Sequence, residues 1–564
     1  MKKISIFISS LVFVGILLYS CTDDFLKAPA QASLDEGTLA NEAGVNAALI
    51  SAYSMLDGWN HDWGQFSPPW PTAGSNWIWG SVASDDAYKG SEPGDQGEIT
   101  QIELYQWTPG NTYFEGKFKA LYEGISRSNS ALKLAAGATS VPAAAKTILE
   151  GESQFLRAHF HFDAWKMWKN VPYYTEADKD FRKPNTENII PKITDDLKAA
   201  IAKLPVNQSQ LGRATKGAAQ AYLGKVLLYS GDLAGAKTQL EAVVSSGKYD
   251  LAPCFRDVFA VSTENGKEMI FSIQSSVNDG TSEGQNGNFA DRLNNPHGGS
   301  PFGCCGFHQP SQNLVNAYRT DANGLPLLDN FNNSDLTAAE NVDPRLDLTV
   351  GRDDVPYLTW GKHAPEWIRS RSWAGPYSPK KFAPDNSSQV SSVGWVNTQL
   401  NSVNRPIIRY ADVLLMLAEI EVEIGSLEKA REYVNKIRAR AKNCAQGADG
   451  TITANIADPK ITWAKYNIGL YTTPWTNKET TLKAVRMERR LELALEGNRF
   501  FDLRRWGIAQ KVINDYLSVE GNKRTYLKDA TPFAEKHNLY PLPSVQIELS
   551  KKDGTAQLKQ NPGY

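Results

Sequence analysis

The sequence predicts a mostly α-helical protein. Helical hairpins of the tetratricopeptide type are expected to form a scaffold, which a large loop-rich insertion with short strands interrupts. Three observations predict this fold class. Apolar residues recur at helical spacing in two blocks of the chain, and a helix–glycine–helix pattern occurs in each block. The stretch between the blocks, roughly residues 250–405, is rich in Gly, Asn, Ser and Pro.

The first helical block begins near residue 113. Phe114, Phe118 and Ile125 lie at helical intervals there, which predicts a helix over residues 113–134. Pro172 and Pro205 follow two further segments of helical pattern, and proline is disfavoured inside a helix. Helices are therefore also predicted over residues 152–168, 189–204, 218–230 and 233–246.

The hairpin over residues 218–246 has a counterpart in the second block. Leu223, Gly231, Leu233, Ala236 and Leu240 correspond in spacing to Leu417, Gly425, Leu427, Ala430 and Val434. The glycine permits a tight reversal and the alanine lets two helices approach, as in a tetratricopeptide unit. Two copies so far apart are no tandem array, so we expect helical pairs of one scaffold. Within the insertion, residues 269–273 are predicted to form a short strand.

Composition excludes several classes of function. The 60 Lys and Arg residues nearly balance the 62 Asp and Glu residues, which leaves a formal net charge of −2. No basic field is therefore available to hold nucleic acid or an anionic membrane face. The 43 glycines and 29 prolines are ordinary usage for 564 residues, which excludes a collagen-like or low-complexity chain. We expect a globular body.

The first twenty residues are typical of a targeting segment. Lys2 and Lys3 precede an apolar run over residues 4–19, which is short for a membrane span of about 20 residues but fits a secretory signal. Ser20 before Cys21 resembles the lipobox of bacterial lipoproteins, which implies cleavage before Cys21 and its acylation. The acidic pair at residues 23–24 resembles the surface-export signal of Bacteroidetes lipoproteins. The alternative is an ordinary signal peptide with an incidental cysteine.

The spacing of four further cysteines limits which redox or metal sites the chain can form. They are Cys254, Cys304, Cys305 and Cys444, and no Cys-x-x-Cys spacing supports a zinc or thioredoxin-like site. In an oxidising compartment, adjacent Cys304 and Cys305 either close a vicinal disulfide, which forms a stiff apolar ledge, or remain two buried thiols. The sequence leaves both possibilities open.

Several segments, in chain order, resemble the SusD/RagB family of surface glycan-binding lipoproteins of Bacteroidetes. The most specific are Arg-Tyr-Ala-Asp-Val-Leu-Leu at residues 409–415 and Glu-Arg-Arg-Leu-Glu-Leu at residues 488–493, continued by Phe-Asp-Leu-Arg-Arg-Trp at residues 501–506. Shorter matches lie at residues 21–26, 155–158, 171–172, 212–215, 267–271, 343–346, 540–543 and 560–564. One motif alone would be weak, whereas so many in order are specific.

The resemblance implies an organisation and a role. A lipoprotein signal peptide is expected over residues 1–20 and a single SusD-like domain over residues 21–564. The helical scaffold is expected near residues 35–57, 111–249 and 406–508, ligand-binding loops near 58–110 and 250–405, and a C-terminal segment over 509–564. The family implies an outer-membrane, cell-surface protein anchored through Cys21. Such a protein binds an oligosaccharide or polysaccharide and delivers it to a SusC-like TonB-dependent transporter, without catalysis.

The charged residues of the shared motifs are predicted to be structural. Between Glu488 and Arg505 the charge signs alternate at helical spacing, which favours ion pairs over one isolated catalytic carboxylate. Arg409 and Asp412 are likewise expected to be polar groups of the scaffold. These motifs therefore identify the fold rather than a ligand site.

Two groups of aromatic residues are the candidates for ligand binding, because sugars stack on aromatic rings and require polar partners for their hydroxyl groups. The first comprises Trp59, Trp63, Trp70, Trp77 and Trp79, and the second Trp360, Trp367, Trp373 and Trp395 beside Arg369 and Arg371. The predicted ligand-binding residues are Asn60, Asp62, Trp77, Trp79, Asp85, Asp86, Cys304, Cys305, Arg371 and Trp373. By contrast, Trp165, Trp168 and Trp506 are predicted to pack in the core.

No metal or cofactor site is predicted. His159 and His161 point in nearly opposite directions on a helix and cannot chelate one ion together. Residues 321–324 are similar to the start of a calcium loop but lack its later ligands, so a plain turn is expected; a structural calcium ion stays as an alternative that no full motif supports.

Two other functions stay as alternatives. One is a glycoside hydrolase using Asp62 with Asp85 or Asp86, which would require a suitable carboxylate separation. The other is a scaffold that binds a peptide or docks protein alone. The glycan is not identified by the sequence, and an α-glucan or a fructan is a guess.

Overall fold

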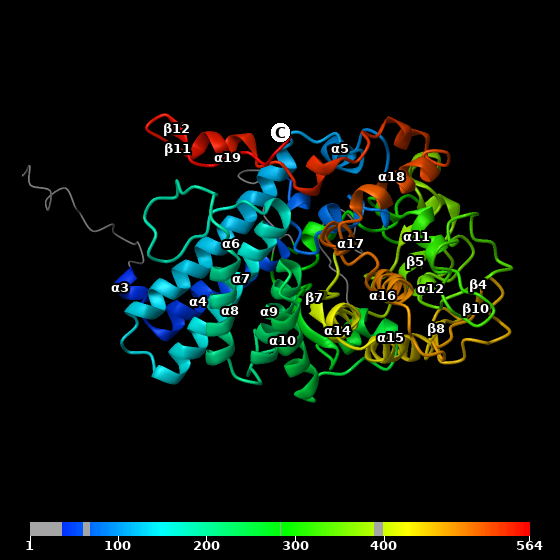
Figure 1. Cartoon of the computed structure of the whole chain (residues 1–564), viewed down its shortest axis with the longest axis horizontal. Coiled ribbons are helices and arrows are strands. Elements are labelled where there is room, and N and C mark those ends of the chain that lie inside the picture. Colours follow the sequence, from blue (N-terminus) through cyan, green and yellow to red (C-terminus); the bar gives the residue numbers. More distant parts are fainter. Residues whose placement is uncertain (1–35, 60–67, 282–283, 389–398) are drawn as a thin grey trace, which may run out of the picture.

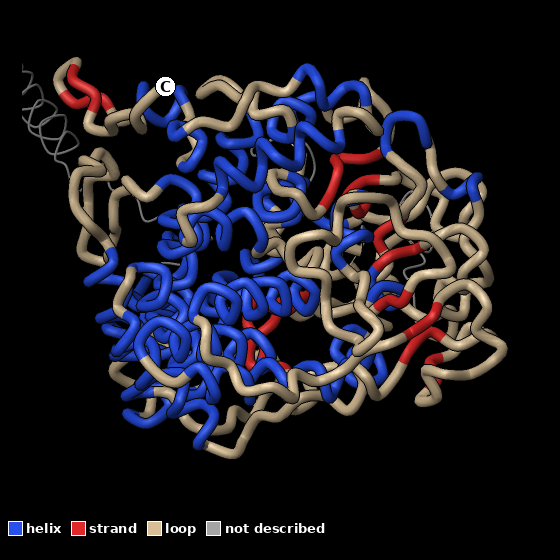
Figure 2. The backbone as a smooth tube through the Cα atoms, turned by 45° about the vertical axis from the view of Figure 1, so that its right-hand side comes forward, coloured by secondary structure: helices blue, strands red, loops and turns tan. Residues whose placement is uncertain are grey.

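The computed structural model of the chain describes residues 36–59, 68–281, 284–388 and 399–564. Helices fill one half of the molecule, and the other half consists mainly of loops with short strands (Figures 1 and 2). The predicted fold class is therefore confirmed. The predicted residues Cys21, Asn60, Asp62, Trp63 and Trp395 lie outside the described residues.

The first helical block is built around two long helices, α6 (Thr112–Gly137) and α7 (Ala143–Trp168). At the start of α6 the Asn111 side chain accepts a hydrogen bond from the Tyr113 amide, which satisfies one of the unpaired amides of the first turn. Helix α7 begins at Ala143 rather than at residue 152, because Pro142 precedes a run of alanines with high helix propensity. The block is completed by α3 (Glu36–Leu39), α4 (Glu42–Tyr53), α8 (Ile190–Lys203), α9 (Lys216–Ser230) and α10 (Leu233–Ser245).

The predicted hairpin repeat is present as α9 with α10 and as α14 (Tyr410–Ile424) with α15 (Leu427–Ala441). Its two glycines serve different purposes. Gly231 adopts a left-handed conformation with φ +91°, which ends α9. Gly425 has no positive φ, but a Cβ atom there would lie 1.9 Å from Oε2 of Glu421, so a larger residue would displace the Glu421 carboxylate.

The described strands form two-stranded sheets, most of them within or beside the insertion. The predicted strand is confirmed as β2 (Met269–Ile273), which pairs antiparallel with β7 (Arg405–Arg409) and joins the two ends of the insertion at its base. A second antiparallel pair, β1 (Ala87–Gly90) with β3 (Phe307–Pro310), joins the N-terminal part of the chain to the insertion. The remaining pairs are β4 (Asn341–Val342) with β10 (Lys465–Tyr466), β5 (Val350–Gly351) with β6 (Ser378–Pro379), β8 (Ala445–Gln446) with β9 (Ile452–Thr453), and β11 (Lys551–Lys552) with β12 (Thr555–Ala556).

The C-terminal part of the chain returns to the scaffold. Its helices are α16 (Lys478–Leu493), α17 (Arg499–Arg505), α18 (Ala509–Glu520) and α19 (Ser544–Leu549), and shorter helices elsewhere are α5 (Gly97–Glu103), α11 (Gln312–Ala317), α12 (Leu346–Thr349) and α13 (Arg371–Ala374). Trp168 is fully buried in the main core, and Trp165 and Trp506 are half-buried against it. The prediction that these three pack as core residues is confirmed.

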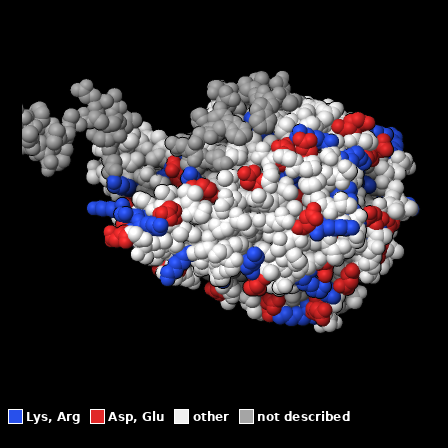
Figure 3. All heavy atoms as spheres, turned by 90° about the horizontal axis from the view of Figure 1, so that it is seen from above, with Lys and Arg blue, Asp and Glu red and all other residues white. Residues whose placement is uncertain are grey.

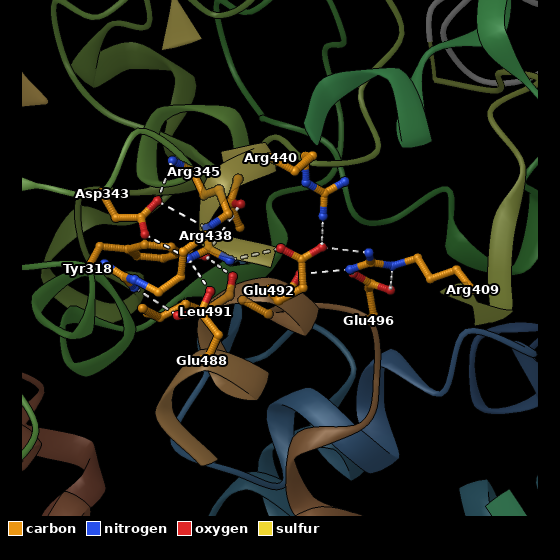
Figure 4. Close-up of polar contacts among 12 residues, drawn as sticks. Tyr318, Asp343, Arg345, Arg409, Arg438, Arg440, Glu488, Leu491, Glu492 and Glu496 are labelled. Carbon is orange, nitrogen blue, oxygen red and sulfur yellow. Dashed lines mark hydrogen bonds and ion pairs between the residues drawn. The ribbon is translucent and has the colours of Figure 1, made fainter. Parts of the chain in front are cut away.

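A buried network of ion pairs connects the scaffold to the insertion (Figure 4). Arg345 of the insertion lies 2.7 Å from both Asp343 and Glu488 and 2.8 Å from Glu492, and all four side chains are fully buried. Glu492 of α16 also pairs with Arg409 at 2.6 Å and with Arg440 of α15. The prediction that these motif charges form structural ion pairs is confirmed.

Two disulfide bonds are present in the described chain. Cys254 is bonded to Cys444, which fastens the start of the insertion to the segment after α15. Cys304 and Cys305 are bonded to each other, so the vicinal disulfide is the form that the structure contains. A bond that closes a long loop restricts the unfolded chain, so the Cys254–Cys444 bond stabilises the junction between insertion and scaffold.

No large area of a single charge sign is visible on the face drawn in Figure 3, where Lys and Arg residues are interspersed with Asp and Glu residues. This pattern agrees with the small net charge. Among the helices of the described ranges, none combines the length and the apolar character needed to cross a membrane.

We predict that Glu492→Gln strongly destabilises the fold. The amide leaves Arg345, Arg409 and Arg440 buried with one carboxylate fewer, and breaking such a buried network costs about 3–5 kcal/mol. Urea unfolding followed by circular dichroism measures the difference. Glu432→Gln, on the exposed face of α15, is the matched control and should change the free energy of unfolding by less than about 0.5 kcal/mol. Equal stabilities of the two variants would contradict a central role of the network.

The same network predicts acid sensitivity. Burial opposes ionisation of Glu492, but Arg440, Arg409 and Arg345 outweigh it and hold its pKa well below the usual 4.5. A carboxyl group whose pKa is lowered by folding stabilises the protein above its unfolded-state pKa, and that stabilisation is lost as the pH falls below it. The free energy of unfolding should therefore decrease below about pH 5. The decrease should be smaller in Glu492→Gln, and an identical pH profile would refute this assignment.

Candidate functional site

Trp70, Trp77 and Trp79 of the first group belong to the core and not to a binding surface. Trp77 and Trp79 lie in the π-helix η3 (Trp77–Val82) and are each only 1% exposed. The indole of Trp79 packs against Phe114 and Tyr540 at centroid distances of 5.2 and 5.4 Å, and its Nε1 donates to the Pro71 carbonyl. The prediction that Trp77 and Trp79 stack on a ligand is therefore wrong, because neither ring is accessible.

Asp85 and Asp86 are also structural. Both are buried, and Arg499 holds Asp85 with two hydrogen bonds of 2.8 and 2.9 Å. Arg490 reaches Asp86 at 2.8 Å. Although burial opposes ionisation, Arg490 and Arg499 lower the pKa of Asp85 to about 2. These carboxylates are committed to buried arginines, so the prediction that they contact a ligand is wrong.

Two of the three described tryptophans of the second group, Trp360 and Trp367, belong to a small core of their own. Trp367 is buried, and Trp360 packs against Phe302 at a centroid distance of 5.2 Å while its Nε1 donates to the Pro384 carbonyl. Trp373 is half-buried, and one face of its indole stacks on Tyr526 at 3.7 Å. Trp367 and Trp373 both lie in one of the loops considered next, where Trp367 is buried and Trp373 is half-buried.

Three loops meet at one edge of the β1–β3 pair, and we call them the loop cluster: residues 90–96, residues 294–306 and residues 365–375. The pairing of Gly90 with Phe307 brings the first two loops together, and the Ser91 amide donates to the Gly306 carbonyl at 2.5 Å. The third loop joins through the His297 amide, which donates to the Trp367 carbonyl at 2.7 Å. Segments far apart in the sequence therefore form one surface.

An ion-paired group of three residues, Arg369, Glu92 and Asp95, lies on this surface. Arg369 donates to Asp95 at 2.7 Å and to Glu92 at 2.6 Å, and its guanidinium also contacts the Ser91 hydroxyl at 3.1 Å. Arg369, Glu92 and Asp95 remain 31%, 44% and 24% exposed, so each can still contact a ligand. Burial and the nearby guanidinium lower the pKa of His297, which leaves its imidazole uncharged at neutral pH.

The predicted residues Cys304, Cys305 and Arg371 lie in or beside the loop cluster. Cys304 is half-buried, whereas Cys305 is buried and its sulfur accepts a hydrogen bond from Gln399 Nε2 at 3.3 Å. Arg371 is half-exposed and pairs with Asp353 at 2.6 Å. The structure therefore brings together four of the predicted residues, namely these three and Trp373.

Sequence reasoning missed the polar residues of the first two loops. Ser91, Glu92, Asp95 and His297, with Lys89 of the adjoining strand β1, carry no motif. The β1–β3 pairing and the His297–Trp367 hydrogen bond bring them to the loop that carries Arg369. The one available signal was the pair of acidic residues at 92 and 95. Their charge is opposite to that of Arg369, but the sequence does not indicate that Arg369 lies beside them.

The chemistry offered by the loop cluster is recognition. Its carboxylates accept hydrogen bonds, its guanidinium donates them, and the disulfide and Trp373 provide apolar surface. Among the described residues no group of three or more His, Cys, Asp or Glu could hold a metal ion. In the turn proposed as a partial calcium loop, the Asp321 side chain instead accepts from the amides of Asn323 and Leu325, both at 2.8 Å.

A separate cleft of about 450 Å³ lies between α6, residues 172–181 and α19. Aromatic residues including Tyr122, Tyr174 and Phe181 line it, together with polar groups. It shares no residue with the loop cluster, and none of the predicted site residues lines it.

Comparison with known proteins supports one family over the length of the chain. The model described as the SusD family matches residues 267–564, and a model described as "Starch-binding associating with outer membrane" matches residues 66–228. SusD-like protein P25 of Formosa agariphila is 24% identical, over 96% of this chain and 97% of that protein. SusD-like protein P38 of the same organism is also 24% identical, over 91% and 93% of the two chains.

Solved structures share the fold. A SusD superfamily protein from Bacteroides vulgatus has a TM-score of 0.68 and 22% identity, covering 93% of this chain and 99% of that one. A laminarin-binding SusD-like protein has a TM-score of 0.66 and 24% identity, covering 93% and 100%. Surface glycan-binding protein A from Bacteroides thetaiotaomicron, in complex with laminarihexaose, has a TM-score of 0.66 and 20% identity, covering 92% and 99%. At these identities the likeness establishes the fold alone.

We predict that Trp79→Ala destabilises the protein by about 3–5 kcal/mol, because it leaves a cavity between Phe114 and Tyr540. Thermal and urea unfolding measure the change. Leu211→Ala is the control, since Leu211 is 81% exposed and its loss should matter little. A stable Trp79→Ala protein with weakened glycan binding would instead restore Trp79 to a ligand-stacking role.

Proposed function

The chain belongs to the SusD family, and on this premise we propose that it is a cell-surface protein that binds an oligosaccharide or polysaccharide without chemically changing it. The family match over most of the chain carries the proposal. The loop cluster is the proposed site of contact, because it combines exposed polar side chains with apolar surface on loops that a rigid scaffold holds.

The polar groups of the loop cluster suit sugar hydroxyl groups. Each hydroxyl donates one hydrogen bond and accepts others, so a carboxylate beside a guanidinium can satisfy both roles. Glu92 and Asp95 already share Arg369, which orders all three side chains before a ligand arrives. Less conformational entropy is then lost on binding. The sugar's apolar faces would pack on the Cys304–Cys305 disulfide and on the exposed part of the half-buried Trp373.

Absence of catalysis is part of the proposal. Of the carboxylates considered for hydrolysis, Asp85 and Asp86 are buried in ion pairs with Arg499 and Arg490. Glu92 and Asp95 both pair with the same arginine, at 2.6 and 2.7 Å. This arrangement favours binding over turnover.

The remaining parts of the proposal concern location and cargo. We infer that Cys21 is acylated and that the protein is attached to the outer membrane. The lipobox-like sequence supports the acylation, and the description of the second family model, which names the outer membrane, supports the location. Bound glycan would pass to a SusC-like TonB-dependent transporter. No cofactor is required for this role.

Laminarihexaose is the first ligand to test, because two of the structural neighbours are named for laminarin or laminarihexaose. The panel should include an α-glucan, a fructan and an acidic oligosaccharide, measured by calorimetric titration of the protein lacking its first 21 residues. We expect one member to bind, with no release of reducing ends. Release of reducing ends from a bound glycan would identify an enzyme instead. If no oligosaccharide of the panel binds, a peptide ligand is favoured.

Variants locate the site once a ligand binds. Arg369→Ala should weaken binding about tenfold, since it removes a donor and frees Glu92 and Asp95. Arg182→Ala is the matched control, because Arg182 is also a surface arginine paired with an aspartate, Asp180 at 2.9 Å, and lies outside the loop cluster. Equal affinities of the two variants would move the site away from the loop cluster.

A further inference from the structure

Lys89 is a buried lysine at the base of the loop cluster. It belongs to β1, and its side chain has no exposed surface. Its ammonium group lies 5.6 Å from the centre of the Trp373 ring and 5.9 Å from that of Phe307. Burying an ammonium group is costly unless its three donors find partners, so the contacts of this group indicate its role.

Those partners are backbone carbonyls of the neighbouring loop. Lys89 Nζ donates to the Glu92 carbonyl at 2.8 Å and to the Asp95 carbonyl at 2.6 Å, and the Pro93 carbonyl lies at 3.5 Å. These oxygens converge on one point only if residues 92–95 form a tight turn. The lysine therefore holds the turn from the inside.

Arg369 holds the same turn from the outside. It pairs with the side chains of Glu92 and Asp95, whereas Lys89 binds the main-chain carbonyls of the same two residues. The inner contact lies in the buried part of the protein, where hydrogen bonds to a charged donor are stronger than at the surface. The inner contact therefore contributes more to the shape of the turn.

We propose that Lys89 is a positioning residue of the loop cluster, whose ammonium group holds the carbonyls of Glu92 and Asp95 and so fixes the turn that presents those two carboxylates to a ligand. This inference rests on the proposed function for its consequence in glycan binding. Its structural part, an ordered turn that depends on Lys89, does not require any ligand.

The geometry also makes the turn sensitive to pH. Burial lowers the pKa of Lys89 to about 8, against the opposing effect of Glu103, Asp95 and Glu92, and Arg369 lowers it further. The elements around it also carry Arg371, which is paired with Asp353, and Tyr526, which donates to Glu103 at 2.7 Å. Further charged or titratable groups there are Arg524, which donates to the Arg371 carbonyl at 3.3 Å, Tyr88, which donates to Glu520, and His297. The two carbonyls favour the charged form of the amine, so when Lys89 loses its proton above pH 8 while it stays buried, it loses one donor and its bonds to these carbonyls weaken.

The effect on global stability has the opposite sign. A lysine whose pKa is lowered by folding binds its proton less tightly in the folded state, so raising the pH from about 8 to 10.5 removes the cost of burying the charge. Overall stability should not fall with the loss of this proton. A loss of order confined to the turn therefore distinguishes the local role of Lys89 from general unfolding.

Hydrogen exchange of the ligand-free mature protein tests the proposal. In Lys89→Met, the amides of Ser91 and Asp95 should exchange at least about fivefold faster than in the wild type at pH 7, because the turn opens more often. Lys117→Met is the matched control. Lys117 is also buried with its pKa lowered to about 8, but it contacts the Ala73 carbonyl and Asp163 instead of the turn. That variant should leave exchange at residues 90–97 unchanged.

A pH series gives a second readout if Lys89→Met fails to fold. After correction for intrinsic exchange rates, protection of residues 90–97 in the wild type should fall between pH 7 and pH 9. In Lys89→Arg, whose guanidinium keeps its charge, protection should not fall. Unchanged exchange in folded Lys89→Met, or an equal pH effect in Lys89→Arg, would overturn the proposal.

If laminarihexaose or another glycan of the panel binds the wild-type protein, the Lys89→Met substitution should weaken that binding. Failure of every glycan would count against the proposed function and leave the exchange result to decide the role of Lys89.

Discussion

The buried ion pairs around Glu492 are the constraint on which the rest of the structure depends. One face of α16 carries Glu488 and Glu492, and these carboxylates bind arginines from the insertion, from β7 and from α15. A carboxylate or guanidinium buried alone would be strongly unfavourable, so each segment is stable in its place only while the others are present. The insertion is thereby fixed to the helical scaffold by charge in addition to apolar contact. The disulfide between Cys254 and Cys444 and the β2–β7 pair act at the same junction.

The same helix determines where the loop cluster lies. Arg490 of α16 binds Asp86, and Asp86 is followed directly by β1, which pairs with β3 and leads into the turn over residues 91–96. Only one strand therefore separates the buried ionic core from the surface at which we propose that glycan binds. This connection explains why Asp85 and Asp86, although they lie in the chain beside polar loop residues, are unavailable to a ligand. Their charge is used to hold the strand, and the exposed carboxylates lie a few residues later, at Glu92 and Asp95.

The helical part of the fold was predictable because its signals are local. The spacing of Phe114, Phe118 and Ile125, the glycine after α9 and the prolines after helix ends act over a few residues, and the structure has helices where they indicate them. The alternating charges of α16 likewise predicted ion pairs correctly. The candidate site was predictable only in part. Cys304, Cys305, Arg371 and Trp373 lie in or beside the loop cluster, whereas Trp77 and Trp79 are core residues, because clustering of tryptophan in a sequence carries no information on which side of the chain faces solvent.

By itself, the sequence determined the fold class, the helical repeat and the family, because each of these is recorded in short-range spacing or in motifs that occur in a definite order. Tertiary structure alone decided which polar residues reach the surface together. The segment with Lys89 and Glu92 is far in the chain from His297 and from Arg369, and the three regions meet through one pair of short strands and a few loop contacts. Burial also decided the role of each charge. The same carboxylate chemistry serves the core at Asp85, where arginines and low dielectric enclose it, and is free to meet a ligand at Glu92, where water still reaches it.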